Sequence, residues 1–304
     1  MSLEKDERVA MRLPSRHRGC LPDFIVGDNS TSLFDLAHTL RIENPVRLIE
    51  DSPITTIGLR SPSGGGALVN VTLHSHPADE MVYMLREEAA RDVYDLGSRT
   101  TEGDLLDIGG HIGLTALLFH RLHPDAHVHV FEPAPLNFFY LAYNAVQNGV
   151  DGKRVHLYNR GLSRDGSPFL IEYSPDDTTS TRRASLGHSW GKLDKSYHTV
   201  RSFGMKQLRS CLPLDDVGLV KLDCEGCEFD LVPSDSRFFS ARERRMVGEF
   251  HGWHVRQPGH IGNVSHRLVQ TVRTLLCGRE RQGEDRIEWL NGPPRRRREA
   301  RVSC

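Results

Sequence analysis

The segment VKLDCEGCEFDLV, residues 220–232, gathers side chains that could do chemistry around one glycine, Gly226. Its acids are Asp223, Glu225, Glu228 and Asp230, and its cysteines are Cys224 and Cys227. Paired carboxylates could hold a cation or accept a proton, whereas a C-x-x-C pair could bind a metal or cycle between thiols and a disulfide. The elements that carry the segment decide between these chemistries.

A second candidate is a glycine-rich loop. In LLDIGGHIG, residues 105–113, Gly109, Gly110 and Gly113 follow an apolar strand and precede an apolar-faced helix. Glycines there allow a tight turn and a close approach to a ligand, and the helix N-terminus offers free N–H groups. A tight turn that binds nothing would show the same glycines, so the loop needs support from elsewhere.

That support comes from two acids at strand ends. Glu132 ends the next strand, where a carboxylate can hold two ribose hydroxyls. The dinucleotide fingerprint G-x-G-x-x-G fails, because its first glycine falls at Ile108, and Asp107 would repel a diphosphate. S-adenosylmethionine carries a sulfonium and an amino group instead, which tolerate a carboxylate. The pattern therefore favours S-adenosylmethionine over NAD.

The elements around this loop alternate between strand and helix. Apolar runs predict strands over 104–110, 127–133 and 154–159, and helical spacing predicts helices over 112–123 and 136–149. This βαβαβ order predicts an α/β fold with a parallel sheet and right-handed crossovers.

Two later strands bring the opening segment to the same edge. Strands are predicted over 218–224 and 244–251, and ligands of open parallel sheets bind outside the carboxyl ends of the strands. We therefore expect Asp223 to position the cofactor or acceptor, and Glu225 or His251 to act as general base. The alternatives stay open: Glu225 as an acid that stabilises a helix N-terminus, and His251 as a packing histidine.

The flanks are predicted with shorter elements. Strands are expected at 45–50, 54–60, 67–75, 167–173 and 198–205, a helix at 77–96, and a late helix and strand at 260–278 and 285–290.

Composition adds bounds on function. The chain has 304 residues, with 39 Lys plus Arg against 40 Asp plus Glu, a balance that predicts no clear nucleic-acid partner. No apolar run reaches the about 20 residues that span a bilayer, and the charged first 20 residues predict no signal peptide. Six scattered cysteines predict reduced thiols, so a cytoplasmic protein is expected.

Histidine pairs and the C-x-x-C spacing raise the question of a metal. The pairs are His74 with His76, His127 with His129, and His251 with His254. Neither they nor the two cysteines have further ligands at zinc spacing, so no metal site is predicted. We interpret Cys224 and Cys227 as incidental packing, with a thiol-redox or zinc role as the alternative.

Five segments together resemble the FkbM-type methyltransferases. They are LLDIGGHIGLTAL, VHVFEPAPLNFFYLAYNAVQNGV, RVHLYNRGLSRDG, LVKLDCEGCEFDLV and VGEFHG, in the family's order. Matching positions are Asp107, Gly109 and Gly113 in the cofactor loop, Glu132 as the ribose acid, and Asp223, Glu225 and Gly226 in the signature. Gly110 and His111 depart from the residues that the family often has there, Ala and Asn.

The resemblance implies a class I Rossmann-like fold, mostly a parallel sheet flanked by helices, that uses S-adenosylmethionine. It implies O-methylation of a hydroxyl on a small-molecule or glycosidic acceptor. We expect a polar, partly disordered lead-in over 1–45, an extension over 46–100, the methyltransferase domain over 101–290 and a basic, solvated tail over 291–304. The alternatives are a nicotinamide-dependent oxidoreductase and a non-catalytic, degenerate member that only binds.

Overall fold

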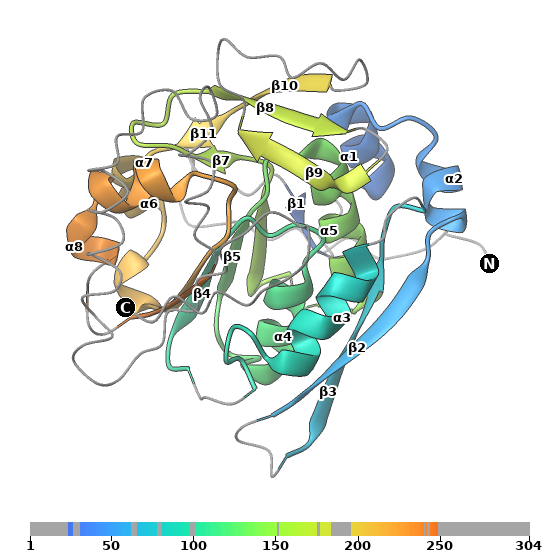
Figure 1. Cartoon of the computed structure of the whole chain (residues 1–304), viewed down its shortest axis with the longest axis horizontal. Helices are drawn as coiled ribbons and strands as arrows, with labels where there is room; N and C mark the ends of the chain where they lie inside the picture. Colours follow the sequence, from blue (N-terminus) through green and yellow to red (C-terminus); the bar gives the residue numbers. More distant parts are fainter. Residues whose placement is uncertain are drawn as a thin grey trace, which may run out of the picture.

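A six-stranded, mostly parallel sheet forms the centre of the molecule (Figure 1). The computed structural model describes residues 24–26, 31–61, 66–77, 81–97, 101–150, 152–174, 177–183, 196–239, 241 and 244–248. In sheet order the strands are β1 (Phe24–Ile25), β6 (Val155–Tyr158), β5 (Val128–Phe131), β4 (Asp104–Ile108), β12 (Val217–Leu222) and β13 (Arg245–Gly248). All are parallel except β1, which pairs antiparallel with β6.

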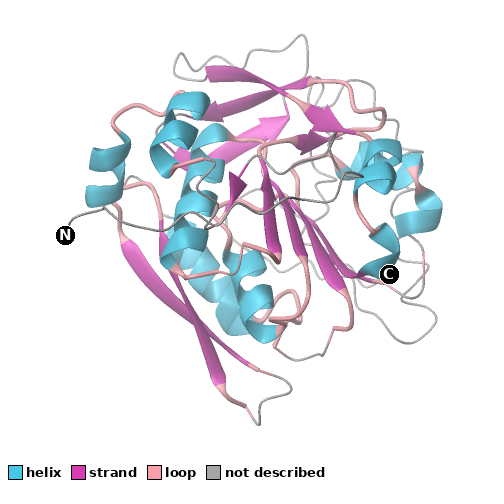
Figure 2. Cartoon of the chain, turned by 180° about the vertical axis from the view of Figure 1, so that it is seen from behind, coloured by secondary structure: helices cyan, strands magenta, loops and turns pink. Residues whose placement is uncertain are grey.

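Helices cover both faces of this sheet, as the front and back views show (Figure 1, Figure 2). One face carries α1 (Leu33–Leu40), α3 (Met81–Arg91), α4 (Leu114–Leu122) and α5 (Pro135–Gln147); the other carries α6 (Met205–Cys211), α7 (Glu228–Ser234) and α8 (Ser236–Phe239), with a 3-10 turn at Leu214–Asp216. Alternate strand residues enter the two cores: Leu105 packs with the first group and Leu106 with the second. The predicted α/β fold, a parallel sheet flanked by helices, is confirmed.

The N-terminal layer contains one wrong prediction. Residues 45–50, expected as a strand, form α2 (Pro45–Glu50). Pro45 occupies the first turn, where a helix needs no N–H from it, and Arg47 Nε lies 3.2 Å from Asp51 Oδ2 one turn later. These local helix signals outweigh the β-branched residues of the segment. Within the predicted lead-in, Ser32 and Asp35 form a capping box that starts α1.

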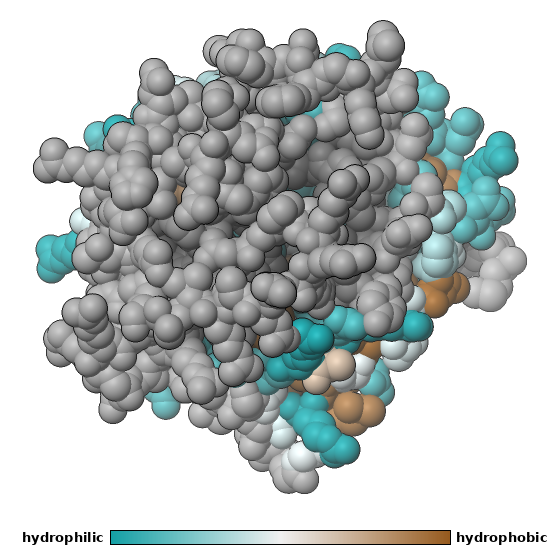
Figure 3. Space-filling view, in the orientation of Figure 1, coloured by the Kyte–Doolittle hydropathy of each residue, from teal (hydrophilic) through white to brown (hydrophobic). Residues whose placement is uncertain are grey.

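The predicted strands at 54–60 and 67–75 are confirmed as β2 (Ile54–Arg60) and β3 (Leu68–His74), which form an antiparallel hairpin. The buried residues of β2 are Thr55, Ile57 and Leu59, and Val71 and Leu73 of β3 are buried beside them. The outward face mixes polar and apolar side chains. Ile54 and Leu68 are among the exposed large apolar residues. Teal and brown residues accordingly interleave where the hairpin reaches the surface (Figure 3).

Two asparagines of α5 bind the free edge of β3. Asn144 Oδ1 accepts from the His74 backbone N–H at 2.7 Å, and its Nδ2 donates to the His74 carbonyl at 3.0 Å. Asn148 makes the same pair with Thr72, at 2.9 and 2.7 Å. Asn144 Nδ2 also donates to the Ile112 carbonyl in the glycine loop at 2.9 Å. Four residues along a helix and two residues along a strand both advance by about 6–7 Å. Asn144 and Asn148 can therefore bind alternate residues of the β3 edge.

A small antiparallel sheet, β10-β8-β9, lies beyond the carboxyl end of β5. It consists of β8 (Phe169–Ser174), β9 (Asp177–Arg183) and β10 (Ser196–Val200), and Ile171 and Val200 pack on Ala134, just after β5. The sequence did not predict β9, because its residues are mostly polar. The strand predicted over 198–205 is divided between β10, β11 (Ser202–Phe203), which pairs with β7 (Gly161–Leu162), and the start of α6.

The predicted late helix, final strand and basic tail lie outside the described residues. Among the helices of the described residues, none is long and apolar enough to cross a membrane.

Candidate active site

The strand order changes direction between β4 and β12, and the predicted site residues gather there. β4 leads into the glycine loop, and its other neighbour, β5, leads to Glu132. In open α/β sheets such a switch point opens a crevice beyond the carboxyl ends of the strands, where ligands bind. The sheet order thus brings Asp107, Glu132 and Asp223 to one edge.

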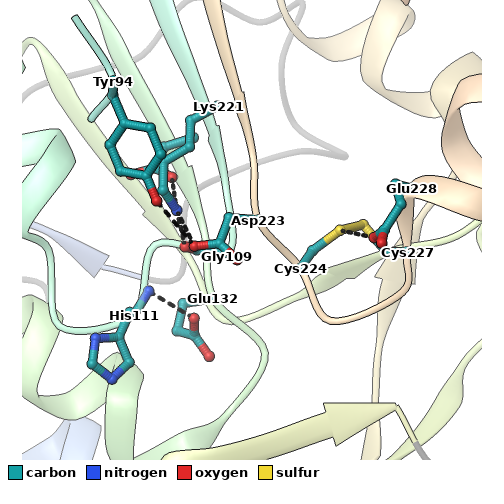
Figure 4. A network of polar contacts seen from close by, with 10 residues as sticks. Tyr94, Gly109, His111, Glu132, Lys221, Asp223, Cys224, Cys227 and Glu228 are labelled. Carbon is teal, nitrogen blue, oxygen red and sulfur yellow. Dashed lines mark hydrogen bonds and ion pairs between the residues drawn. A yellow bond between two sulfur atoms is a disulfide. The ribbon is translucent and has the colours of Figure 1, made fainter. Parts of the chain in front are cut away.

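Lys221 is the centre of a buried ionic network at this edge (Figure 4). Its Nζ lies 3.3 Å from Asp107 Oδ1 and 3.5 Å from Asp223 Oδ2, and it donates to the Gly109 carbonyl at 2.6 Å. Lys221 thus forms ion pairs with the acids of both strands. The ammonium joins the ends of β4 and β12 to the start of the glycine loop.

Sequence reasoning missed Tyr94, which reaches this network from the segment after α3. Its hydroxyl donates to Asp223 Oδ2 at 3.3 Å, and Lys221 Nζ lies 5.6 Å from its ring centroid (Figure 4). Only 8% of Tyr94 is exposed. Nothing in the spacing around Tyr94 distinguishes it from a packing aromatic, because its role depends on how the N-terminal layer folds over the sheet.

Glu132 is buried and held by two backbone N–H groups. His111 N donates to its Oε2 at 2.8 Å (Figure 4). Ala134 N donates to its Oε1, also at 2.8 Å. Each carboxylate oxygen keeps a second lone pair, so the group could still accept from two neighbouring hydroxyls. Burial raises the pKa of Glu132 to about 7, although both N–H groups oppose that rise.

Three carboxyl groups surround one ammonium in this acidic cluster, which we define as Asp107, Glu132, Lys221 and Asp223. Burial raises the pKa of Asp107, and the Lys221 ammonium opposes the rise. Burial lowers the pKa of Lys221, but the Asp107 and Asp223 carboxylates outweigh it and keep that pKa above its ordinary value. The ammonium is therefore charged near neutral pH, and the carboxyl groups outnumber it.

The glycines of the loop are required by the protein's own packing. Gly109 and Gly113 have φ values of 91° and 100°, which L side chains rarely adopt. A Cβ on Gly109 would collide with the Asp223 carbonyl oxygen, and one on Gly110 with Val130. The predicted tight turn is confirmed, and the close approach is to the ends of β12 and β5. These glycines let the loop lie against the acidic cluster.

Of the two candidate general bases, the structure describes Glu225 but not His251. Glu225 lies in the turn between β12 and α7, partly exposed, with φ of 53°. It lies three residues before α7, whose first turn holds Glu228 and Asp230, so the alternative of Glu225 as an acid at the helix N-terminus stays a prediction. His251 lies outside the described residues.

The prediction of reduced, merely packing cysteines is wrong for Cys224 and Cys227, which form a disulfide (Figure 4). The β12–α7 turn brings their Cα atoms to 5.4 Å, within the range that a disulfide spans. No cysteine among the described residues is a free thiol. The scattered spacing along the chain could not reveal this pairing, because a two-residue gap fits packing, metal and disulfide alike.

The described residues contain no group of three or more His, Cys, Asp or Glu that could hold a metal. His127, His129 and His156, which we call the histidine stack, instead pack ring on ring at centroid separations of 4.9–6.4 Å. His127 Nδ1 lies 3.2 Å from His156 Nε2, and Arg154 donates to His127 Nε2 at 3.1 Å.

The acidic cluster suits a cationic ligand that also carries a ribose. Its carboxyl groups outnumber its one ammonium, a lining that disfavours a diphosphate, and Glu132 is placed to accept from hydroxyls. S-adenosylmethionine has both required features, so the residues present fit it. Asp107 and Asp223 would face its positive groups and Glu132 its ribose.

Comparison with known proteins gives the family. The family profile of the methyltransferase FkbM domain matches residues 107–284. The 31-O-demethyl-FK506 methyltransferase FkbM of Streptomyces tacrolimicus is 36% identical over 219 residues, which cover 64% of this chain and 81% of that protein. Methyltransferase 1 of Beauveria bassiana (strain ARSEF 2860) is 26% identical over 178 residues, covering 53% of this chain and 70% of that one.

Among solved structures, methyltransferase FkbM from Methylobacillus flagellatus KT aligns with a TM-score of 0.31 and 13% identity. The alignment covers 55% of this chain and 42% of that one. The family profile spans more than half of the chain, and the Streptomyces relative is matched over most of its length. The chain belongs to the methyltransferase FkbM domain family.

Proposed function

We propose that the chain is an S-adenosylmethionine-dependent methyltransferase that methylates a hydroxyl of a small-molecule or glycan-like acceptor. The observation that carries the proposal is the pair of carboxyl groups around one buried ammonium at the β4–β12 switch point, next to a third carboxyl group that can hold a ribose. The name of the Streptomyces relative, which specifies a 31-O position, supports an oxygen acceptor.

Each residue of the acidic cluster has a role in this proposal. Asp107 and Asp223 offset the positive charge of the bound cofactor, and Lys221 keeps them aligned and prevents their mutual repulsion. Glu132 accepts from the ribose hydroxyls. S-adenosylmethionine supplies a methyl group on a cationic sulfur, and the protein contributes mainly alignment, worth up to about 7–11 kcal/mol.

The acceptor hydroxyl must lose its proton. The carboxylate of Asp223 already contacts Tyr94 and Lys221, so we assign Asp223 the role of positioning the cofactor or acceptor. We propose Glu225, on the partly exposed turn, as the general base, with His251 as the alternative that the sequence predicts. The β10-β8-β9 sheet, packed on Ala134 two residues after Glu132, would line the acceptor side.

Calorimetric titration with S-adenosylhomocysteine, S-adenosylmethionine and NAD tests the cofactor. Binding of both sulfur ligands is expected, and Asp107→Asn should weaken it at least tenfold. Asp104→Asn, at the other end of β4, is the matched control, because Asp104 bonds the His127 N–H at 2.7 Å and lies far along the strand. Binding of NAD alone would overturn the proposal.

A methyl-transfer screen with labelled cofactor against a cell extract, followed by mass identification of the product, would name the acceptor. With that acceptor, Glu225→Gln should lower kcat and leave the cofactor affinity unchanged, whereas His251→Gln should leave both unchanged. Loss of kcat in the His251 variant alone would move the base assignment to His251. Absence of any labelled product from a protein that binds S-adenosylhomocysteine would favour the non-catalytic alternative.

A further inference from the structure

The Cys224–Cys227 disulfide closes the turn that follows Asp223. β12 ends at Leu222, and α7 begins at Glu228, so the bridge lies between the acidic cluster and the helix behind it. Figure 4 shows the two sulfur atoms on the same turn as Asp223, on the side away from Glu132. The proposed methyl transfer makes no use of this pair.

The two cysteines differ in their exposure to solvent. Cys227, at the start of α7, is 5% exposed, whereas Cys224 is partly exposed. Cys224 Sγ lies 3.6 Å from Oε2 of Glu228, which is fully buried and accepts from the Gly226 N–H at 3.0 Å. An attacking thiolate can therefore reach Cys224, and Glu228 is placed to accept a hydrogen bond from a Cys224 thiol.

The bridge also holds a turn of unfavourable backbone conformation. Glu225 has φ of 53° and Gly226 has φ of 105°, two left-handed residues in succession. A left-handed non-glycine residue persists only where surrounding structure holds it. Only a 3.4 Å backbone hydrogen bond, from Cys227 N to the Cys224 carbonyl, spans the same turn among the backbone bonds of the described residues. The disulfide is thus a covalent restraint on the turn, beside the hydrogen bond from Gly226 N to Glu228 Oε2.

Movement of this turn would reach the acidic cluster through Asp223. The Asp223 N–H donates to the Ile108 carbonyl at 3.0 Å, and the Asp223 carbonyl lies where a Gly109 side chain would be. Its carboxylate contacts Lys221 and Tyr94. Asp223, which precedes Cys224 in the chain, therefore contacts both the start of the glycine loop and the side chains of the acidic cluster.

We propose that Cys224 and Cys227 form a reversible redox site, exchanged by a dithiol at the Cys224 sulfur, and that its reduction weakens cofactor binding. The second half rests on the proposed function. A reductant thiolate attacks Cys224 Sγ, forms a mixed disulfide and releases Cys227 as a thiolate that takes a proton. The second reductant thiol then displaces Cys224, which is protonated in turn. Two electrons pass to the protein, and the dithiol leaves as a disulfide.

Redox titration of the full chain tests the site itself. The protein is equilibrated in mixtures of reduced and oxidised dithiothreitol, alkylated, digested and analysed by mass spectrometry. The peptide with Cys224 and Cys227 should change from no label to two labels in one reversible transition. A pair that stays unlabelled throughout, or labelled throughout, overturns the proposal whether or not any cofactor binds.

Two further measurements test the coupling. Hydrogen exchange at the Asp223 amide should become faster on reduction, and the dissociation constant for S-adenosylhomocysteine should rise about fivefold as the turn is released. Cys224→Ser/Cys227→Ser should match the reduced protein and no longer respond to dithiothreitol. Cys211, which is also disulfide-bonded, remains in this variant, so the comparison controls for reduction at that cysteine. Equal exchange and equal affinity in both redox states would overturn the coupling. Lack of binding in both states, with a normal redox transition, would instead overturn the proposed function.

Discussion

The two ends of the parallel sheet carry titratable groups that behave in opposite ways. At the carboxyl ends, the acidic cluster surrounds one ammonium with carboxyl groups, and burial raises the pKa of Glu132 to about 7. At the amino ends of β5 and β6, the guanidinium of Arg154 contacts the histidine stack. Burial and the neighbouring His127 lower the pKa of His156 to about 4.

This difference shows how topology separates a site from packing. Each group at the carboxyl ends comes from a different strand or loop and meets at the switch point, where backbone ends leave room for a ligand. The histidines come from adjacent positions on paired strands, since His129 lies opposite His156, and their rings fill the space between them. A cluster of ionisable residues in the sequence therefore does not indicate a ligand site unless the end of the sheet at which it lies is known.

The largest expected effect comes from removing the ammonium of the acidic cluster. Lys221→Met leaves the buried Asp107 and the partly buried Asp223 without their cation, so the free energy of unfolding should fall by about 3–5 kcal/mol. Binding of S-adenosylhomocysteine should be lost with it. Urea unfolding and calorimetry measure the two effects. The matched control is Arg154→Met beside the histidine stack, which should cost less than about 1 kcal/mol; equal losses would remove the distinction between the ends.

The next effect is a pH slope at the charged end. The pKa of Glu132 is raised from 4.5 to about 7, so its contribution to stability is full below pH 4.5 and is lost as pH rises to 7. This amounts to about 3 kcal/mol. Glu132→Gln should remove that fall, so its unfolding free energy should decline less, or rise, across the interval. Urea unfolding at half-unit pH steps gives the slope, and parallel curves for the two proteins would contradict the assignment.

The histidine stack should give a slope of the opposite sign. The pKa of His156 is lowered from 6.5 to about 4, so its contribution is full above pH 6.5 and is lost as pH falls toward 4. The loss should be about 2 kcal/mol, reduced by partial exposure of the ring. His156→Gln should therefore make the protein more resistant to acid relative to its own stability at pH 7. A variant that loses stability on acidification as steeply as the parent would refute this.

The smallest effect concerns the residue that the sequence did not reveal. Tyr94→Phe removes the hydroxyl that donates to Asp223 and keeps the ring over Lys221, so about 1 kcal/mol of stability should be lost. The dissociation constant for S-adenosylhomocysteine should rise a few-fold. Tyr197→Phe, at an exposed tyrosine of β10, is the control and should change neither quantity.

The sequence predicted the sheet well and its surroundings less well. The strands ending at Ile108, Phe131 and Leu222 are apolar runs closed by glycine or an acid, so their pattern is strong. Helix α2 was predicted as a strand because Pro45 and the Arg47–Asp51 pair were given too little weight against its β-branched residues. Strand β9 was missed because it pairs through its backbone while its side chains are mostly polar.

The candidate site shows the same limit. Asp107, Glu132 and Asp223 could be placed from sequence, because each lies at or just after the end of a recognisable strand. Tyr94 and the Cys224–Cys227 bond could not, since both depend on distances between segments or on turn geometry that spacing leaves open. The cofactor roles of the glycine loop, the general base and a cytoplasmic location stay predictions.

The asparagines that bind the edge of β3 have a consequence for any shortened form of the protein. Asn144 serves β3 and the Ile112 carbonyl with one buried amide, and Tyr94 reaches Asp223 from the same N-terminal layer. A truncated chain that begins at residue 101 would keep the parallel strands, but these polar groups would lose their hydrogen-bond partners. It would also expose the apolar side of α4 and α5 to solvent. The N-terminal layer is therefore part of the smallest unit that can be expected to hold the acidic cluster in place.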